Sequence, residues 1–284
     1  MIKINIKKKL HGSYGDMDLY VNVDIQNGSF VTLAGESGSG KTTLLRILAG
    51  LEESSGSIVV DDKIFQNENI FLKPQKRGVG FVFQDYALFA NMSVEDNLLF
   101  VKKDKELAKY LLDVTNLTEL KNRLPNTLSG GQKQRVSLCR AMMNKPKLLL
   151  MDEPLSALDP MMRMKLQNEI LSLHKEFKIT TIMVSHDPSE IYTLSDRVLM
   201  LNQGKIVDDG IPKDVLLKTS GSSKFAFEGK LLDIIKVDVI NVAIISIGQQ
   251  LVEVVVSNDE VKNLNIGQKV SVSTKAFSPI IKGL

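Results

Sequence analysis

One strand–loop–helix segment constrains the fold of this chain more than any other feature. Residues 35–42 read Gly-Glu-Ser-Gly-Ser-Gly-Lys-Thr, which fits the pattern G-x-x-x-x-G-K-[ST]. Residues 29–34 are predicted to form a short strand before this loop, and residues 43–49 a helix after it. In such a setting the backbone N–H groups of the loop cradle phosphates. The segment therefore predicts an α/β fold with a phosphate-binding P-loop.

The residues of this loop predict how a nucleotide would be held. Lys41 would reach the β- and γ-phosphates, and the Thr42 hydroxyl would bind Mg²⁺. The remaining contacts are expected from Gly35, Ser37, Gly38, Ser39, Gly40 and Thr43. The alternative is a glycine-rich turn without a ligand, which the flanking strand and helix disfavour.

A second strand is predicted to carry acidic chemistry at its end. The apolar run of residues 148–151 is typical of a buried parallel strand, and Asp152 and Glu153 follow it. Ligands in open α/β sheets bind at the carboxyl ends of strands. We expect Asp152 to hold Mg²⁺, mostly through water, and Glu153 to polarise an attacking water as general base. An isolated Asp-Glu pair is usually a solvated turn, but the upstream phosphate loop makes that interpretation poor.

Three single polar residues extend this pattern. Gln84 ends an apolar strand and could reach Mg²⁺ or the water through its amide. His186 ends another strand and could contact the γ-phosphate, and Asp159 could lie at a subunit seam. Each has a plainer interpretation: a polar strand end, a surface histidine and a helix cap before Pro160. We favour the functional interpretation because the three occur together, in this order.

Between the phosphate loop and the acidic strand lies a glycine-rich pentapeptide, residues 128–132, Leu-Ser-Gly-Gly-Gln. Ser129 is suited to cap a helix over residues 132–143, whose N-terminus would favour an anion. Gly130 and Gly131 would let the backbone approach a phosphate closely.

Together these motifs resemble the nucleotide-binding subunits of ABC importers, over roughly residues 1–215. In that family they act as the Walker A loop, the Q-loop with Gln84, the signature, the Walker B strand with its catalytic glutamate, the D-loop and the switch histidine. The resemblance implies a head-to-tail homodimer that sandwiches two ATP molecules with Mg²⁺. Lys41 and Glu153 of one chain would then face a signature surface of the partner, formed by Ser129, Gly130, Gly131 and Gln132.

The resemblance also implies partners and a location. Transmembrane permease subunits would dock near Gln84, a periplasmic or extracellular solute-binding protein would supply the solute, and the chain would lie on the cytoplasmic face of the membrane. The family stacks the adenine on an aromatic residue some two dozen positions before the phosphate loop. Tyr14 is the natural candidate, and Tyr20 is a nearby alternative.

The domain organisation follows from a change in composition near residue 219. We expect an ATPase domain over residues 1–218 with a helical subdomain at about 86–145, a linker at 219–223 and a small domain at 224–284. Within the subdomain, Ser93 is predicted to cap a helix, and residues 107, 111 and 112 to mark the apolar face of another.

The final domain is predicted to be a small all-β barrel of OB type. Strands are expected at 239–247, 251–256 and 269–273, with turns at 258–259 and 265–268. It resembles, more weakly, the TOBE/Mop-type accessory domain of molybdate and tungstate importer ATPases, with a closing strand at 275–282. Lys224 stands where that family often has arginine, so an oxyanion-binding domain and a ligand-free, dimer-stabilising barrel both remain open.

Composition excludes some partners. The chain has 36 Lys and Arg against 33 Asp and Glu, which gives no case for nucleic acid. The lysine runs at 7–9 and 102–103 are interpreted as solvated faces, and Cys139 as a packing residue. No apolar stretch approaches the roughly 20 residues that span a bilayer. Residues 1–6 alternate as an edge strand and lack the apolar core of a signal peptide.

These observations predict an ATPase that energises import of an oxyanion. Molybdate or tungstate is the first expectation, followed by sulfate and then ferric iron. Two alternatives come from other classes: a soluble ABC ATPase acting on ribosomes or DNA, and an oxyanion-binding module with a vestigial cassette.

Overall fold

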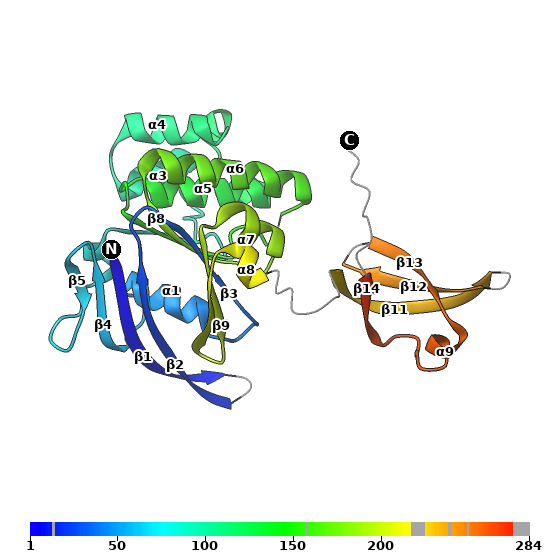
Figure 1. Ribbon diagram of the computed structural model, residues 1–284. Coiled ribbons are helices and arrows are strands. Elements are labelled where there is room, and N and C mark those ends of the chain that lie inside the picture. Colours follow the sequence, from blue (N-terminus) through cyan, green and yellow to red (C-terminus); the bar gives the residue numbers. More distant parts are fainter. Residues whose placement is uncertain (13–14, 157, 217–224, 238–239, 249, 275–284) are drawn as a thin grey trace. The chain divides into compact units, whose positions relative to one another are not determined.

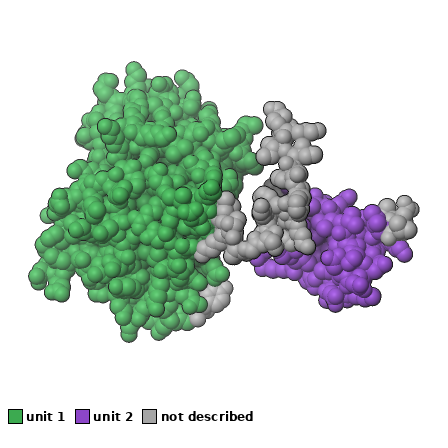
Figure 2. Space-filling model, viewed as in Figure 1, with its two compact units in different colours: residues 1–217 green, residues 218–284 purple. Residues whose placement is uncertain are grey.

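The chain is described here by a computed structural model, which covers residues 1–12, 15–156, 158–216, 225–237, 240–248 and 250–274. Two compact units, residues 1–217 and 218–284, make up the chain (Figure 2). In the described part of the chain, no helix has the length and apolarity needed to cross a membrane.

The first unit is built on a ten-stranded sheet of order β5-β4-β1-β2-β10-β9-β3-β8-β7-β6 (Figure 1). Its strands are β1 (Ile2–Gly12), β2 (Gly15–Ile25), β3 (Phe30–Ala34), β4 (Ser55–Val60), β5 (Lys63–Gln66), β6 (Val79–Val82), β7 (Leu148–Asp152), β8 (Thr180–Val184), β9 (Arg197–Asn202) and β10 (Lys205–Gly210). Its α-helices are α1 (Lys41–Ala49), α2 (Pro74–Arg77), α3 (Val94–Val101), α4 (Lys105–Val114), α5 (Gly130–Met142), α6 (Pro160–Phe177), α7 (Pro188–Leu194) and α8 (Pro212–Leu216).

The centre of this sheet is parallel. β3 pairs in parallel with β8 and β9, and β7 pairs in parallel with β6 and β8. All five residues of each of β3, β7 and β8 are buried, and most of them are apolar, as is typical of central parallel strands. Figure 1 shows α1 on one side of this sheet and α3 to α6 on the other. The carboxyl ends of β3, β7 and β8 therefore meet at one edge.

The expectation of an edge strand at residues 1–6 is wrong. β1 lies between β2 and β4 and pairs antiparallel with both. Its alternation has another cause: Ile2, Ile4 and Ile6 are buried in the core, while the residues between them are exposed. Alternation shows that one face of a strand is buried, but it does not show whether the strand has one neighbour or two.

The helical segment between β6 and β7 forms as expected. The Ser93 side chain accepts a hydrogen bond from the backbone N–H of Asp96 at 3.1 Å and so caps α3. Leu107, Leu111 and Leu112 of α4 are buried in one apolar cluster together with Cys139 of α5. Burial raises the pKa of the Cys139 thiol to about 12, so this residue is a packing group at neutral pH.

The second unit contains a four-stranded antiparallel sheet of order β13-β12-β11-β14. Its elements are β11 (Phe225–Val237), β12 (Ile240–Ile247), β13 (Gln250–Val256), α9 (Asn258–Val261) and β14 (Lys269–Thr274). The three expected strands are confirmed. The turn expected at residues 258–259 is wrong, since these residues begin the single turn of α9. Lys224, the linker at 219–223 and the closing strand at 275–282 lie outside the described residues.

Candidate active site

The phosphate loop is held against β9 by a glycine. Gly35 follows β3 with φ of 133°, a backbone conformation that L side chains rarely adopt. A Cβ atom at Gly35 would lie 2.0 Å from the backbone oxygen of Leu201. No side chain fits there, so Gly35 lets the loop pass directly over β9. The loop ends at Gly40, which caps α1 with φ of 102°.

Lys41 holds a positive charge inside this loop. Its Nζ donates to the carbonyl oxygens of Gly35 at 2.8 Å and Glu36 at 2.6 Å, and its side chain is buried. Burial lowers the pKa of Lys41, whereas the carboxylates of Glu153 and Asp152 raise it. An ammonium group held in a glycine-rich loop is complementary to a phosphate chain.

Thr42 and Asp152 form the second part of the site. The Thr42 hydroxyl donates to Asp152 Oδ1 at 3.0 Å, which links the start of α1 to the end of β7. Burial raises the pKa of Asp152, while the hydrogen bond from Thr42 lowers it. No cluster of three or more His, Cys, Asp or Glu side chains suited to a metal occurs among the described residues. A hydroxyl beside one carboxylate fits Mg²⁺, which takes few protein ligands and completes its shell with water and phosphate oxygens.

Glu153 and His186 lie side by side at the ends of adjacent strands. The distance from His186 Nδ1 to Glu153 Oε1 is 3.5 Å. Glu153 has φ of 46°, a left-handed conformation that costs a non-glycine residue roughly 1–2 kcal/mol. Its backbone N–H donates to the Val184 oxygen at 3.2 Å, which anchors the strained residue to β8. A carboxylate thus faces an imidazole beside the Thr42–Asp152 pair.

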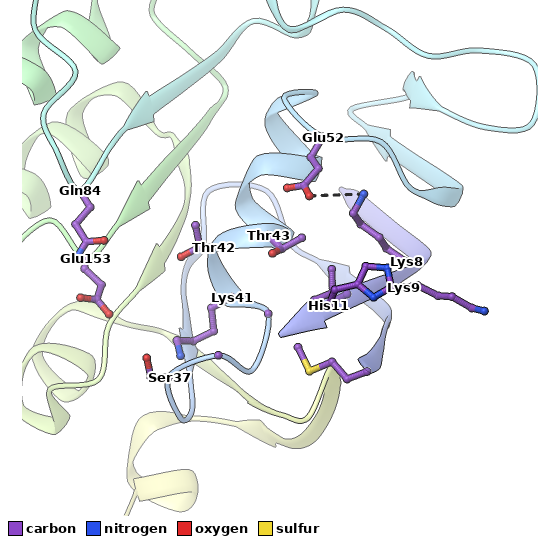
Figure 3. A pocket seen from close by; sticks show the side chains of 14 residues that line it. Lys8, Lys9, His11, Ser37, Lys41, Thr42, Thr43, Glu52, Gln84 and Glu153 are labelled. Atoms are coloured by element: carbon purple, nitrogen blue, oxygen red, sulfur yellow. Dashed lines mark ion pairs between the residues drawn. The ribbon is translucent and has the colours of Figure 1, made fainter. Parts of the chain in front are cut away.

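A cavity of about 690 Å³ is lined by Lys41, Thr42 and Glu153, whereas Asp152 and His186 are not among the described residues that line it (Figure 3). In Figure 3, Gln84 and Glu153 lie to one side of Lys41 and Thr42, and Lys8, His11 and Glu52 lie to the other. The lining residues are Lys8, Lys9, Leu10, His11, Met17, Ser37, Gly38, Gly40, Lys41, Thr42, Thr43, Glu52, Gln84 and Glu153. Gln84, Glu153 and most of the expected loop residues thus share one space.

Sequence reasoning missed the part of this cavity that β1 contributes. Lys8 and Lys9 line it. Lys9 is exposed, as a solvated face requires, whereas Lys8 is half-buried, so the interpretation of their run as a solvated face fails for Lys8. Lys8 Nζ donates to the Glu53 carbonyl oxygen at 2.6 Å and lies 3.6 Å from Glu52 Oε1. The placement depends on β1 passing beside α1, and no local sequence signal reports it.

The two candidates for contact with an adenine differ in what the structure says of them. Tyr14 lies outside the described residues. Tyr20 lies on β2 with 46% of its surface exposed, and it is not among the described residues that line the cavity.

The pentapeptide at residues 128–132 forms a capped helix start. Ser129 Oγ accepts from the Gln132 backbone N–H at 3.3 Å, and Gln132 Oε1 accepts from the Ser129 N–H at 2.9 Å. This capping box confirms the expected helix start at Ser129. A Cβ atom at Gly131 would lie 2.8 Å from Met162 Cε, so the glycine allows α5 to pack closely on α6. Ser129 and Gly130 are exposed.

Asp159 caps the next helix. Its Oδ1 accepts from the backbone N–H groups of Met161 at 3.1 Å and Met162 at 3.0 Å. The capping interpretation is therefore confirmed, and a contact across a subunit seam stays a prediction. Neither Asp159 nor residues 129–132 are among the described residues that line the cavity with Lys41. Within one chain, the expected site is assembled only in part.

The chain is similar to known ABC transporter proteins. The family model for the ABC transporter matches residues 20–156. The spermidine/putrescine import ATP-binding protein PotA of Haemophilus influenzae is 42% identical over 224 residues, covering 76% of this chain and 59% of that protein. The protein of the same name from Bacillus anthracis is 44% identical over 207 residues, covering 70% of this chain and 62% of that protein.

The chain thus spans about three fifths of the length of these curated relatives, 59% and 62%. Both relatives are named for polyamines, so they give the expectation of molybdate no support.

Two solved structures are also similar. One is a dimeric bacterial ABC transporter cassette, with a TM-score of 0.63, 30% identity and coverage of 75% of this chain and 99% of that one. The other is a dimeric ATP-binding cassette in a post-hydrolysis state bound to ADP and Pi, with a TM-score of 0.65, 28% identity and the same coverage.

Proposed function

Because this chain is an ATP-binding domain of the ABC transporter family, we propose that it hydrolyses ATP to energise the import of a solute. The observation that carries this proposal is the hydrogen bond between Thr42 and Asp152, with Lys41 and Glu153 on the same cavity. A phosphate cradle, a position for Mg²⁺ and a carboxylate base occur there together. These are the parts that phosphoryl transfer to water requires.

In the proposed reaction the phosphates of ATP lie along the loop from Gly35 to Thr43, with the Lys41 ammonium beside them. Thr42, Asp152 and Gln84 would hold Mg²⁺, which neutralises charge on the phosphate oxygens. Glu153 accepts a proton from the attacking water as its oxygen bonds to the γ-phosphorus. The bond between that phosphorus and the β–γ bridging oxygen breaks, which leaves ADP and phosphate.

His186 is suited to assist Glu153. Its Nδ1 lies 3.5 Å from the Glu153 carboxylate, and the exposed imidazole can turn toward a γ-phosphate. We propose that Tyr14 stacks on the adenine, which would add roughly 1–3 kcal/mol if it matched base stacking elsewhere.

A second copy of the chain would complete each site. Both similar structures are dimeric. We propose a head-to-tail dimer in which Ser129, Gly130, Gly131 and Gln132 of one chain contact the nucleotide on the Lys41 loop of the other. The exposure of Ser129 and Gly130 and the capped helix behind them support this arrangement, because a helix N-terminus attracts phosphate.

ATP hydrolysis by the purified full chain tests the reaction. Glu153→Gln should lower the rate by about 10²–10⁴-fold, the usual contribution of a general base, and should leave ATP binding intact. Glu68→Gln removes an exposed carboxylate elsewhere and serves as the matched control. Equal rates in the native and Glu153→Gln proteins would remove Glu153 from the mechanism.

The curated relatives favour a polyamine as the solute. Their similarity covers 76% and 70% of this chain, so part of the chain lies outside it. Molybdate, tungstate and sulfate, expected from the weaker resemblance of residues 224–284, are the competing outcomes.

Uptake of labelled spermidine, putrescine, molybdate and sulfate decides between them. Cells that lack the chain would be complemented with either the native protein or Glu153→Gln. Polyamine uptake restored by the native protein alone would support the proposal. Restoration of molybdate uptake instead would return the assignment to the oxyanion class.

A permease helix has a candidate docking surface on the helical segment after Gln84. An apolar cavity of about 440 Å³ lies between Met92, Asp96, Leu99, Phe100, Lys103 and Lys105. Phe100 is 61% exposed and packs against Phe89, with ring centroids 4.6 Å apart. Asn97 Nδ2 donates to the Phe89 carbonyl oxygen at 3.1 Å and Asn97 Oδ1 accepts from its N–H at 2.9 Å, so this segment is fixed on α3.

We propose that a cytoplasmic helix of the permease binds here. Phe100→Ser should lower solute uptake without changing ATP hydrolysis by the purified chain. Tyr192→Ser, at an exposed aromatic residue on α7, is the control. Unchanged uptake in Phe100→Ser would place the docking surface elsewhere.

A further inference from the structure

One arginine connects the Asp159 loop to the loop that carries His186. Arg163 lies in the first turn of α6, one helical turn after Asp159. Its Nη2 donates to the carbonyl oxygen of Leu158 at 3.3 Å, directly before Asp159. Its Nη1 donates to Asp187 Oδ2 at 3.1 Å, directly after His186. A single guanidinium group thus holds both loops.

A buried carboxylate continues this connection. Arg163 Nε lies 3.4 Å from Oε1 of Glu190, whose side chain is buried in α7. Glu190 Oε2 accepts a hydrogen bond from the Ser185 hydroxyl at 2.6 Å. The Asp187 N–H in turn donates to Ser185 Oγ at 3.2 Å. His186 is therefore held on both sides by neighbours that belong to the same network.

The network lies next to the groups proposed to carry out the reaction. A small cavity of about 40 Å³ is lined by Glu153, Ser156, Arg163, Ser185, His186, Asp187 and Glu190. His186 itself is 66% exposed on its side chain, so its own packing does little to fix it. Its position relative to Glu153 depends on the backbone at Ser185 and Asp187.

We propose that Arg163 is a positioning residue, which couples the Asp159 loop to His186 and so sets the His186–Glu153 geometry for hydrolysis. Contact of Asp159 with a second copy of the chain would act on Arg163 through Leu158. The planar guanidinium group suits this role because it donates to the Leu158 oxygen and the Asp187 carboxylate in fixed directions while it pairs with the charge of Glu190, which a lysine cannot do. This inference rests on the proposed ATPase function.

The plainer alternative is that Arg163 only neutralises Glu190. Burial raises the pKa of Glu190, and removal of Arg163 would leave that carboxylate buried without its cation. Two variants separate the alternatives. Arg163→Met removes the coupling and the charge, and Arg163→Met with Glu190→Gln removes both members of the ion pair. Lys165→Gln removes an exposed charge from the same helix and is the matched control.

The experiment measures kcat and KM for ATP with the full chain, together with the thermal midpoint. Arg163→Met should lower kcat by about 10- to 100-fold with KM unchanged, the effect of a misplaced reacting group. The double variant should recover the thermal midpoint but keep the low kcat. Arg163→Lys should fall between native and Arg163→Met.

Hydrogen exchange gives a readout that does not depend on activity. Backbone amides of residues 185–190 should exchange faster in both Arg163→Met proteins and unchanged in Lys165→Gln. Recovery of kcat in the double variant, or unchanged exchange and kcat in Arg163→Met, would overturn the inference. Absence of ATP hydrolysis by the native chain would instead refute the proposed function.

Discussion

Two glycines of the phosphate loop should respond very differently to alanine. Gly35 and Gly38 both have positive φ, at 133° and 81°. A Cβ atom at Gly35 would overlap the Leu201 backbone oxygen at 2.0 Å, whereas a Cβ atom at Gly38 would have nothing within 4 Å. Both substitutions therefore carry a backbone cost, and only Gly35→Ala also carries the overlap.

The magnitudes follow from these two terms. The left-handed backbone costs alanine roughly 1–2 kcal/mol, which is all that Gly38→Ala should lose. Gly35→Ala carries about 1–3 kcal/mol for its less populated conformation. Forced overlap adds a further 1–3 kcal/mol or so, since a strand backbone cannot move aside as a side-chain tip can. We expect Gly35→Ala to be destabilised by about 4 kcal/mol, using the midpoint of both terms.

Thermal unfolding of the full chain without nucleotide, followed by circular dichroism, measures the difference. For a unit of this size each kcal/mol shifts Tm by about 2–4 °C, so Gly35→Ala should melt roughly 8–16 °C below native. Gly38→Ala should melt about 2–8 °C below native by the same scaling. Equal shifts for the two variants would show that the loop does not lie on Leu201.

Two further predictions concern buried polar groups. Burial lowers the pKa of His174 in the folded chain, so as the pH falls the unfolded chain binds a proton at this residue before the folded chain does. The contribution of His174 to the free energy of unfolding should therefore be complete above about pH 6.5 and should decrease as the pH drops below that value. His174→Phe should remove that part of the fall in urea titrations at a series of pH values, and an unchanged pH profile would contradict the assignment. Arg77 Nη1 donates to the Ile47 and Leu48 carbonyl oxygens at 2.7 and 2.9 Å, at the end of α1. Arg77→Met should destabilise the fold by about 2–4 kcal/mol because these carbonyl oxygens lose their donor. Arg46→Met, at an exposed ion pair, is the control and should cost about 1 kcal/mol or less. Equal losses for the two variants in urea unfolding would show that Arg77 does not stabilise the end of α1.

Much of the site was predictable because its signals are local. The start of α5 follows from Ser129 and Gln132, three residues apart, which bond each other's backbone. The phosphate loop follows from glycine spacing between a strand and a helix. Within the described residues the same local rule was available at Ser257 and Glu260, whose capping box starts α9 where a turn was expected.

The sequence-based predictions failed where the outcome depends on strand pairing or on contacts between residues far apart in the sequence. β11 was not predicted because its register against β12 shifts between Leu231 and Asp233, which breaks the alternation of apolar residues. The placement of Lys8 and Lys9 on the cavity depends on β1 lying beside the phosphate loop where α1 begins. A Cβ atom at Gly40, the residue before α1, would lie 3.3 Å from Leu10 Cδ1. Neither the register of β11 nor the position of β1 can be predicted from a short stretch of sequence.

The contacts that couple the motifs to one another are also not predictable from a short stretch of sequence, and α6 is an example. This helix carries no recognisable motif beyond its cap, yet Met162 packs over Gly131 of the signature, and Arg163 holds the His186 loop. Further along, Glu169 forms a buried ion pair with Arg135 of α5 at 2.9 Å. Sequence motifs identify the groups that would touch ATP. The role of α6 in aligning those groups can be recognised only from its contacts in the structure. Substitutions on the buried side of α6 should therefore change the rate of hydrolysis more than the binding of ATP, because they alter the alignment of groups from separate motifs.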